Sequence, residues 1–530
     1  MLKKIISFLS KYFYISIYVL FLSLVMGAAV RGNLGNPNEI QLNDKYWKEE
    51  GPFELSPERG RFILAYSLVE NKSFQFSENL AHFGSPDVAV TKDGKFASLF
   101  APALSFLIIQ GYLTGKLFNA SQVGAFFVIS LFAILNTLLI RKISISLGAG
   151  KIASTIASLT FLFATPAFAY GVNLYQHHIS TFLILLSIYF LINFKGFISL
   201  FFIFLFLSFG VTLDYPNFFM MFPIGLVALR KIISFEKIRS NLKIRVRNIY
   251  LFSAGALTIP ILFLLWFNLM SFDNPFQLSG TLKTVRDFDQ TSLYNPTIQG
   301  IQPNLEQKFG SRKTAIGFFS TRNLTNGFYL HFLSPDRGIL YFTPVLFFSI
   351  IGAAIAYKKR LILCQTLIAI IGISVLLYSM WADPWGGWAF GSRYLIPSYA
   401  IAAIFIAIFL SSLSRNWKSF LGLILFFILF CYSVFVNTLG AITSSANPPQ
   451  VEVLSIEKLS GKEEKYTFLR NWQYLLAGNS KSFVFRSYAQ NYMNSLQFFY
   501  ILMIVILAGS TILFLYMIIN ISRKRYLNTK

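Results

Sequence analysis

The sequence predicts an all-α membrane protein that crosses a bilayer about twelve times. Hydrophobic residues make up 55% of its 530 residues and charged residues only 13%, a composition that no soluble domain requires. The apolar residues lie in continuous runs of about 20, the length at which a helix crosses a membrane. Because these runs are continuous rather than alternating, they exclude a transmembrane barrel.

The apolar runs and their basic flanks set the order of the spans. We expect them at about 12–30, 122–140, 152–170, 179–194, 196–213, 216–229, 249–271, 338–357, 361–381, 395–412, 419–441 and 497–521. Both termini are basic, so an even number of spans places both in the cytoplasm. The segments then assigned to the cytoplasm hold 23 basic residues (Lys and Arg) but only one acidic residue. The outer segments hold 23 basic and 21 acidic residues. The net charge of +24 therefore indicates topology rather than nucleic-acid binding.

Three long segments are expected on the outer face of what is otherwise a single transmembrane domain, residues 1–530. They are 31–121, 272–337 and 442–496. The first holds ten of the chain's 22 acidic residues, and a loop of that length usually has a function. We expect its apolar stretch 96–118 to be a juxtamembrane or re-entrant helix, because a full span there would place every later basic loop outside.

Three carboxylates of the first outer loop are candidates for chemistry. Ser56-Pro57 begins a stretch with helical, amphipathic patterning, which places Glu58 near a helix N-terminus at the membrane surface. In one interpretation, Glu58 interacts favourably with the helix dipole and pairs with a neighbouring arginine. In the other, it acts as a general base or metal ligand. Asp87 is either a solvated carboxylate or a second candidate. Asp93 belongs to an Asp-Gly turn between two short extended pieces and needs no further role.

Two arginines lie at the outer ends of predicted spans. Residues 381–394 contain three of the seven tryptophans, a Gly-Gly pair and Arg393, at the depth where arginine can grip a phosphate with two N–H groups. The alternative for Arg393 is a side chain that snorkels to the interface. In residues 333–341, Arg337 either pairs with the adjacent Asp336 or binds a second anionic head group.

Two further polar motifs lie at span ends on the same side. Asp214 lies between two spans, where a carboxylate costs less than the about 2.5–3.5 kcal/mol of a span centre. In residues 175–178, Tyr-Gln-His-His, two adjacent histidines on a helix point about 100° apart. A single hydrogen-bonding histidine is therefore favoured over a zinc site. No Walker loop, dinucleotide fingerprint or HExxH motif is present.

Together these motifs resemble the GT-C superfamily of integral-membrane glycosyltransferases. The closest likeness is to bacterial relatives of the dolichyl-phosphate-mannose–protein mannosyltransferases, which use polyprenyl-phosphate sugars. The similar pieces are 56–70, 87–102, 176–185, 214–216, 268–276, 333–344 and 385–397. The resemblance implies a first outer loop with juxtamembrane helices and a catalytic carboxylate. That carboxylate is usually Asp in the family, and Glu58 is its match here.

The resemblance implies an enzyme that moves a hexosyl or pentosyl group from a polyprenyl-phosphate carrier to a glycan, lipid or protein acceptor. The reaction would take place at the outer face of the cytoplasmic membrane. Glu58 is the implied general base, and Asp87 and Asp93 are supporting carboxylates. Arg393 and Arg337 would hold the lipid phosphate. The residues expected to line the cavity are His178, Asp214, Trp388 and Tyr394. No metal, other cofactor or nucleic-acid partner is expected.

Two other functions stay open. A transporter or flippase of lipid-linked saccharides predicts ionisable residues deep within several spans, and apart from Asp214 near an edge the predicted spans contain almost none. The glutamate at the position of the family's aspartate leaves an inactive, glycolipid-binding member as the third possibility.

Overall fold

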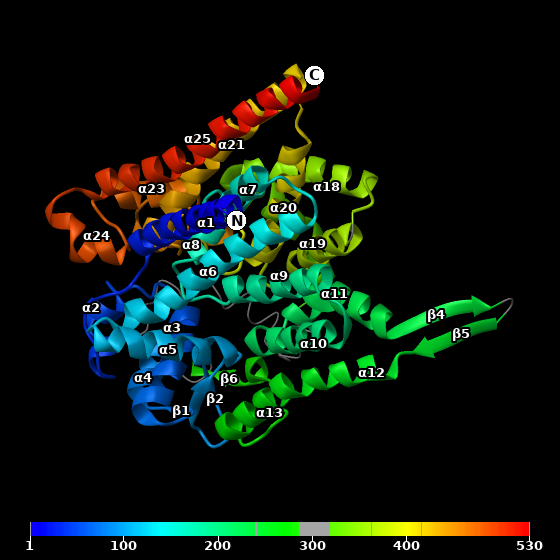
Figure 1. Ribbon diagram of the computed structural model, residues 1–530. Coiled ribbons are helices and arrows are strands. Elements are labelled where there is room, and N and C mark those ends of the chain that lie inside the picture. Colours follow the sequence, from blue (N-terminus) through cyan, green and yellow to red (C-terminus); the bar gives the residue numbers. More distant parts are fainter. Residues whose placement is uncertain (1, 239–240, 286–318, 362, 415, 529–530) are drawn as a thin grey trace.

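The structure of the chain, a computed structural model, describes residues 2–238, 241–285, 319–361, 363–414 and 416–528. It is a helical fold with two small antiparallel sheets (Figure 1). Each of the twelve predicted spans coincides with a helix or a run of short helices, which confirms the all-α fold class. The principal helices of these spans are α1 (Leu2–Ala29), α6 (Ser121–Ser146), α7 (Lys151–Phe163), α9 (His177–Asn193), α10 (Gly196–Leu213), α11 (Asn217–Ile232), α13 (Thr258–Phe272), α18 (Phe348–Lys358), α19 (Cys364–Ser379), α20 (Ile396–Ser412), α21 (Trp417–Ile442) and α25 (Ser495–Asn528).

Six helical stretches within the described residues are long and apolar enough to cross a membrane, by length and composition. They are Ser121–Ser146, Gly196–Leu213, Asn248–Phe272, Arg393–Ser412, Trp417–Ile442 and Ser495–Ile519. The other apolar helices are shorter. Two predicted spans, 152–170 and 338–357, are divided at a proline. In the first, α7 ends at Phe163 and α8 (Ala167–Tyr170) begins after Pro166. In the second, α17 (Ile339–Phe342) ends before Pro344, and α18 follows. Proline has no backbone N–H and cannot continue the hydrogen-bond ladder.

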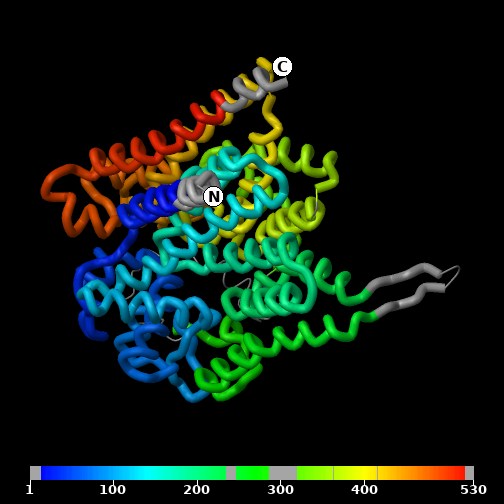
Figure 2. The backbone as a smooth tube through the Cα atoms, viewed as in Figure 1, coloured from blue at the N-terminus to red at the C-terminus, as the bar shows by residue number. Residues whose placement is uncertain are grey.

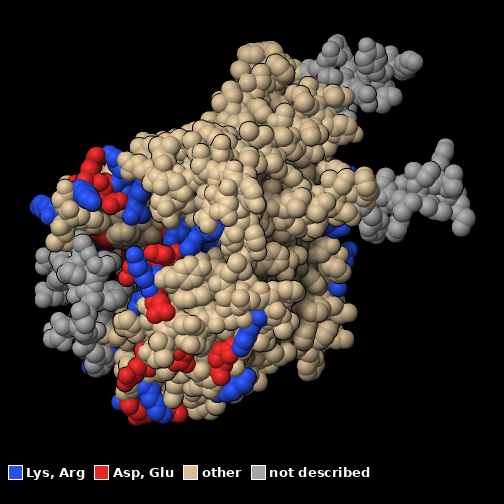
Figure 3. All heavy atoms as spheres, turned by 90° about the vertical axis from the view of Figure 1, so that its left-hand side faces the viewer, with Lys and Arg blue, Asp and Glu red and all other residues tan. Residues whose placement is uncertain are grey.

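The helical body separates two ends of the molecule (Figures 1 and 2). The elements α2 (Lys45–Lys48), α3 (Ser56–Tyr66), α4 (Glu78–Gly84) and α5 (Ala103–Leu117) lie to the left, as does α24 (Phe483–Ser487). The hairpin of β4 (Ile233–Ile238) and β5 (Asn241–Val246) projects to the right. Segments predicted to be outer and inner thus lie at opposite ends, and which end faces the cytoplasm stays a prediction. Figure 3 shows acidic and basic side chains intermingled on the left-hand face.

The first predicted outer loop is folded. A four-stranded antiparallel sheet has the order β1 (Gln75–Phe76), β3 (Phe96–Ser98), β2 (Val88–Val90), β6 (Lys283–Thr284). The β2–β3 hairpin encloses Asp93-Gly94, which confirms the turn between two extended pieces. Strand β6 comes from the second predicted outer segment, so the sheet joins the two. Residues 286–318 of that second segment lie outside the described residues.

Helix α5, in the predicted juxtamembrane stretch, packs backbone to backbone against α6. A Cβ added at Gly124 of α6 would lie 2.0 Å from the Gly111 carbonyl oxygen of α5. One added at Gly115 would lie 3.0 Å from Gly124 Cα. Small residues four apart allow such close approach between membrane helices. At 15 residues α5 is shorter than a bilayer is thick, and its place at the outer face stays a prediction.

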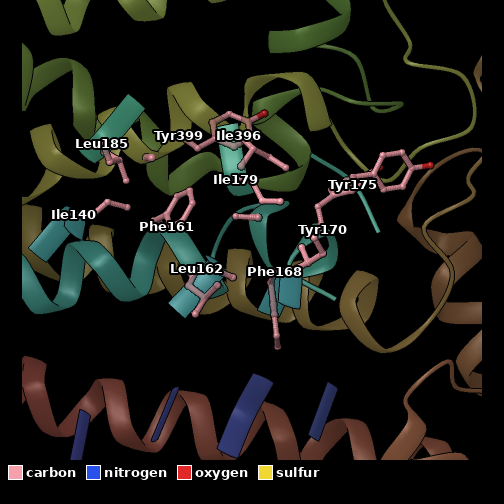
Figure 4. Packing of buried hydrophobic residues seen from close by; sticks show 14 of the residues in the cluster. Ile140, Phe161, Leu162, Phe168, Tyr170, Tyr175, Ile179, Leu185, Ile396 and Tyr399 are labelled. Carbon is pink, nitrogen blue, oxygen red and sulfur yellow. The ribbon is translucent and has the colours of Figure 1, made fainter. Parts of the chain in front are cut away.

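Buried hydrophobic side chains form a continuous core between the helices. Figure 4 shows the part where Phe161 of α7, Phe168 of α8 and Ile179 of α9 meet Ile396 of α20. Every residue of α20 from Ile396 to Leu410 is buried, so this central helix is enclosed on all faces. Tyr175 extends from the edge of the cluster with its ring directed away from it (Figure 4).

A buried ion pair connects the first predicted outer segment to the last. Arg31 Nη1 lies 2.8 Å from Glu54 Oε2, and the two side chains are 0% and 6% exposed. Arg31 Nη2 donates to the Thr443 carbonyl oxygen at 2.6 Å. Glu54 Oε2 also accepts from the Ser445 backbone N–H at 2.6 Å. Segments that lie about 400 residues apart in the chain are therefore fixed to each other.

Candidate active site

Glu58 caps the N-terminus of α3, as the first sequence interpretation predicts, but no ion pair with an arginine is formed within the described residues, and the nearby Arg31 pairs with Glu54 instead. The Glu58 Oε2 accepts from the backbone N–H of Glu54 at 3.0 Å and of Leu55 at 3.4 Å. Its Oε1 accepts from the Leu174 N–H at 3.3 Å. The residue is fully buried, and burial raises its pKa, which the Arg31 charge opposes. Glu58 is thus a helix cap in this structure, and its role as general base stays a prediction.

The rest of α3 is buried rather than amphipathic. Residues 58–67 are all buried, because α3 packs against α4, α5 and β3. Two arginines are enclosed with it and find partners. Arg59 Nη2 donates to the Ser85 carbonyl oxygen at 3.2 Å, and Arg61 Nη1 to the Pro57 carbonyl oxygen at 2.9 Å.

Arg61 connects α3 to two distant segments. Its Nη2 donates to Gln176 Oε1 at 2.8 Å, and Gln176 Nε2 in turn donates to Asp214 Oδ2 at 2.9 Å. The Arg61 guanidinium also lies over the Phe100 ring, 4.3 Å from its centre. Burial lowers the pKa of Arg61, and the neighbouring Arg393 charge acts in the same direction while Asp214 opposes it.

The ring of Tyr175 brings the two arginines together. The Cζ of Arg393 lies 4.6 Å and that of Arg61 5.5 Å from the centre of this ring. Nε and Nη1 of Arg393 are buried and have no hydrogen-bond partner among the described residues. Two positive charges therefore lie beside one ring, and one of the two guanidinium groups has N–H donors without acceptors. A bound anion would accept these hydrogen bonds and compensate the two charges.

Glycines set the course of the chain up to Arg393. Gly386 and Gly391 have φ values of +74° and +60°, which side chains disfavour. A Cβ at Gly386 would lie 3.1 Å from Arg393 Nε, and one at Gly391 would lie 2.8 Å from Pro166. The sequence interpretation that these glycines allow close backbone approach is consistent with this geometry.

Aromatic rings enclose the pair of arginines. Tyr394 stacks on Tyr378 with ring centres 4.4 Å apart and planes at 4°. His177 lies 5.8 Å from Tyr175 and 6.2 Å from Tyr394, and its Nε2 is buried with no partner in the described part of the chain. Trp388 is directed instead to residues 442–496, the last predicted outer segment, where its Nε1 donates to Glu452 Oε2 at 2.7 Å.

The guanidinium group of Arg337 is fully bonded to other protein groups. Its Nη1 lies 2.5 Å from Asp336 Oδ1, which is the pairing that the sequence left open. Its remaining N–H groups donate to carbonyl oxygens of three segments: Nη1 to Asp336, Nε to Trp385, and Nη2 to Gly387 and Asn447. A guanidinium has five N–H donors, and here all five are used. The role of Arg337 toward a lipid phosphate stays a prediction.

The other predicted residues lie in different surroundings. Asp87 is half-buried and accepts from Ser56 Oγ at 2.6 Å. Asp93 is exposed in its turn. His178 is fully buried, with Nε2 at 2.7 Å from the Ala167 carbonyl oxygen and Nδ1 at 3.3 Å from Asn136 Nδ2. Arg393, Asp214 and Tyr394 therefore share one site, and His178 contacts the helix core.

Sequence reasoning missed Arg61, Gln176, Tyr175 and His177. Arg61 lies three residues after Glu58, close to one helical turn, and this spacing could have placed it near the same site. Residues 175–178 were singled out as a motif, but the choice between the two histidines depends on the rotation of α9. Within the described ranges, no three His, Cys, Asp or Glu side chains lie together as metal ligands.

The fold and this site define a helical membrane protein with paired arginines in an aromatic enclosure. No family model matches the chain, and no curated protein matches it. Among solved structures it is similar to ArnT from Cupriavidus metallidurans in the apo state, with TM-score 0.45 and 10% identity over 95% of this chain and 78% of that one. It is also similar to ArnT from the same organism bound to undecaprenyl phosphate, with TM-score 0.42 and 13% identity over 95% and 76%. Both TM-scores are below 0.5, so these similarities carry no conclusion about function.

Proposed function

We propose that this protein is a membrane glycosyltransferase that takes a sugar from a polyprenyl-phosphate carrier. The observation that supports this most is the pairing of Arg61 and Arg393 on the ring of Tyr175, with two buried donors of Arg393 unused. Arginine binds phosphate through parallel N–H groups, and such charge-assisted bonds are about twice as strong as neutral ones.

The position of the arginines favours a phosphate with a lipid tail over a soluble phosphate. Arg393 begins the 3-10 turn η9 (Arg393–Leu395), which leads into α20, and Tyr175 lies in the connection between α8 and α9, so both lie at the ends of apolar helices. Helix α11, which begins three residues after Asp214, exposes Phe218 and Phe219 by 58% and 42%. An anionic head among the arginines with its chain along such apolar surface is the chemistry of a polyprenyl phosphate.

Two kinds of group in the site suit sugar transfer. Breaking the bond between the sugar's anomeric carbon and the phosphate oxygen adds negative charge to the phosphate, and fixed guanidinium groups stabilise that charge as it develops. A carboxylate beside them can take the proton of the acceptor hydroxyl. The finer assignments belong to the same proposal: a hexosyl or pentosyl group, and a glycan, lipid or protein as acceptor.

The structure favours this proposal over transport. A polar cargo that crosses the membrane needs polar or ionisable side chains near the middle of several spans. Helices α9, α10, α19 and α20, which carry or adjoin the site residues, contain no Asp, Glu, Lys or Arg. The charged groups of the site lie instead at helix ends.

Binding of lipid phosphate tests the anion site directly. We would measure the affinity of the purified protein in lipid nanodiscs for undecaprenyl phosphate and for undecaprenol, which lacks the phosphate. We expect a clear preference for the phosphate, and Arg393→Gln should weaken its binding tenfold or more. Arg322→Gln, at an exposed arginine, is the matched control. Equal binding of the two lipids would overturn the proposal.

Transfer separates the three functions. The protein is incubated with radiolabelled polyprenyl-phosphate sugars and crude membrane acceptors, and the label is followed. Movement of label to an acceptor supports the enzyme. Binding of the donor without transfer would show a glycolipid-binding protein, and movement of intact donor between leaflets of a vesicle would show a transporter.

A further inference from the structure

We propose that Asp214, rather than a carboxylate of the first outer loop, takes the proton from the acceptor hydroxyl during sugar transfer. This inference rests on the proposed function and names the base of the same site. Asp214 follows the last residue of α10 and precedes α11. Its N–H donates to the Gly210 carbonyl oxygen at 3.0 Å, and its carbonyl oxygen accepts from the Asn217 N–H at 3.0 Å, so its backbone is fixed.

One oxygen of the Asp214 carboxylate is held and the other is unused. Gln176 Nε2 donates to Oδ2 at 2.9 Å, and Gln176 is itself held by Arg61 at 2.8 Å. No described residue donates a hydrogen bond to Oδ1, and the residue is only half-buried. A base needs this arrangement, because the second oxygen must reach a hydroxyl proton while the first fixes the orientation.

The charges around Asp214 connect it with the anion site. Burial raises its pKa, whereas the Gln176 hydrogen bond and the charges of Arg61 and Arg393 lower it. The carboxylate therefore lies within electrostatic reach of both guanidinium groups that would hold the donor phosphate.

The carboxylates of the first outer loop are placed less well for this step. Glu58 is fully buried and accepts from three backbone N–H groups, so it would have to release the N-terminus of α3 to reach a substrate. Asp93 is exposed at a hairpin turn. Asp87 is partly exposed, and like Asp214 it has one oxygen held, because its Oδ2 accepts from the Ser56 hydroxyl at 2.6 Å. It lies near Arg61, whereas Asp214 interacts with the charges of both Arg61 and Arg393.

The reaction step balances without a cofactor. The acceptor oxygen forms a bond to the anomeric carbon while the bond from that carbon to the phosphate oxygen breaks. The electron pair of the broken bond stays on the phosphate, which leaves as polyprenyl phosphate beside Arg61 and Arg393. The acceptor proton passes to Asp214 and from there to water.

The test compares two neutralised carboxylates at helix ends. With the donor pool and membrane acceptors described above, Asp214→Asn should lower the turnover of sugar transfer by about 10²–10⁴-fold. The affinity of the Asp214→Asn protein for undecaprenyl phosphate should stay within threefold of the wild-type affinity or become higher, because a negative charge near the phosphate is removed. Asp273→Asn is the matched control: Asp273 is exposed, follows α13 as Asp214 follows α10, and has φ +55°, which Asn tolerates. It should keep wild-type turnover.

The outcomes distinguish this inference from the function on which it rests. If wild-type protein transfers sugar and Asp214→Asn keeps more than a third of the turnover, the base is another residue and the proposed function stands. The same holds if Asp214→Asn loses undecaprenyl phosphate binding tenfold, which would show a binding or structural role. If Asp214→Asn does not fold, Asp214→Glu, which keeps the carboxylate, should retain measurable turnover, and its complete loss in folded protein would overturn the assignment. No transfer by wild type would overturn both.

Discussion

The ion pair of Arg31 and Glu54 gives a quantitative test of how the segments 31–121 and 442–496 are joined. Burial alone raises the pKa of Glu54, but Arg31, Lys481 and the Ser445 N–H lower it from 4.5 to about 2. One pH unit corresponds to about 1.4 kcal/mol, so this difference corresponds to about 3 kcal/mol of stabilisation at neutral pH. Removing one partner of a buried pair costs about 3–5 kcal/mol. We therefore expect Glu54→Gln to lower the free energy of unfolding by about 3 kcal/mol at pH 7.

The pH dependence has a defined sign. The pKa of Glu54 is lower in the folded protein than in the unfolded chain, so its stabilisation is complete above about pH 5 and decreases as the pH falls from about 4.5 toward 2. The difference between wild type and Glu54→Gln should narrow over the same range. A difference that grows on acidification would contradict this explanation.

Unfolding by SDS in mild detergent, followed by tryptophan fluorescence, measures the loss through its linear dependence on denaturant. The matched control is Glu50→Gln, which removes the same charge from a pair with Lys45 whose side chains are 53% and 75% exposed. Exposed pairs contribute at most about 1 kcal/mol. If Glu54→Gln and Glu50→Gln lower stability equally, the buried pair does not hold the segments together.

Three further substitutions test the site and its supports. Arg393→Lys keeps the charge but not the planar fork, so undecaprenyl phosphate should bind more weakly than to wild type and more tightly than to Arg393→Gln; equal affinities for Lys and Arg would contradict two-pronged binding. Arg337→Gln leaves the buried Asp336 uncompensated and should cost about 3–5 kcal/mol in the same SDS titration, while an unchanged midpoint would contradict its structural role. Gly124→Ala forces α5 away from α6 at Gly111 and should cost about 1–3 kcal/mol, and a stability equal to wild type would show that the two helices separate freely.

The helices were predictable because each depends on a local pattern. A run of apolar residues long enough to cross a bilayer has few alternatives to a helix. The start of α3 at Ser56-Pro57 and the turn at Asp93-Gly94 also depend only on neighbouring residues. Hydrophobicity alone joins two runs that proline divides, at Pro166 and at Pro344.

The candidate site could be predicted only in part, because its residues come from segments far apart in the chain. Arg393 and Asp214 were found through their own motifs. Arg61 was missed because its partner Gln176 lies 115 residues away. The surroundings of Glu58 could not be predicted from the sequence either. One of the three N–H groups that donate to it belongs to Leu174, which lies 116 residues later in the chain. The residue types indicate which carboxylates could be catalytic, but only the fold shows which of them are buried.

The enclosure of α20 has a consequence for how the protein is assembled. This helix is the tenth of the twelve predicted spans, yet its residues from Ile396 to Leu410 are covered on every side. The earlier helices α6, α7, α9 and α18 all contact it. During synthesis these helices enter the membrane before the helix that fills the space between them, so their inner faces meet lipid first. We therefore expect the bundle to become compact only when α20 replaces that lipid, and Arg393 to reach its place in the same step.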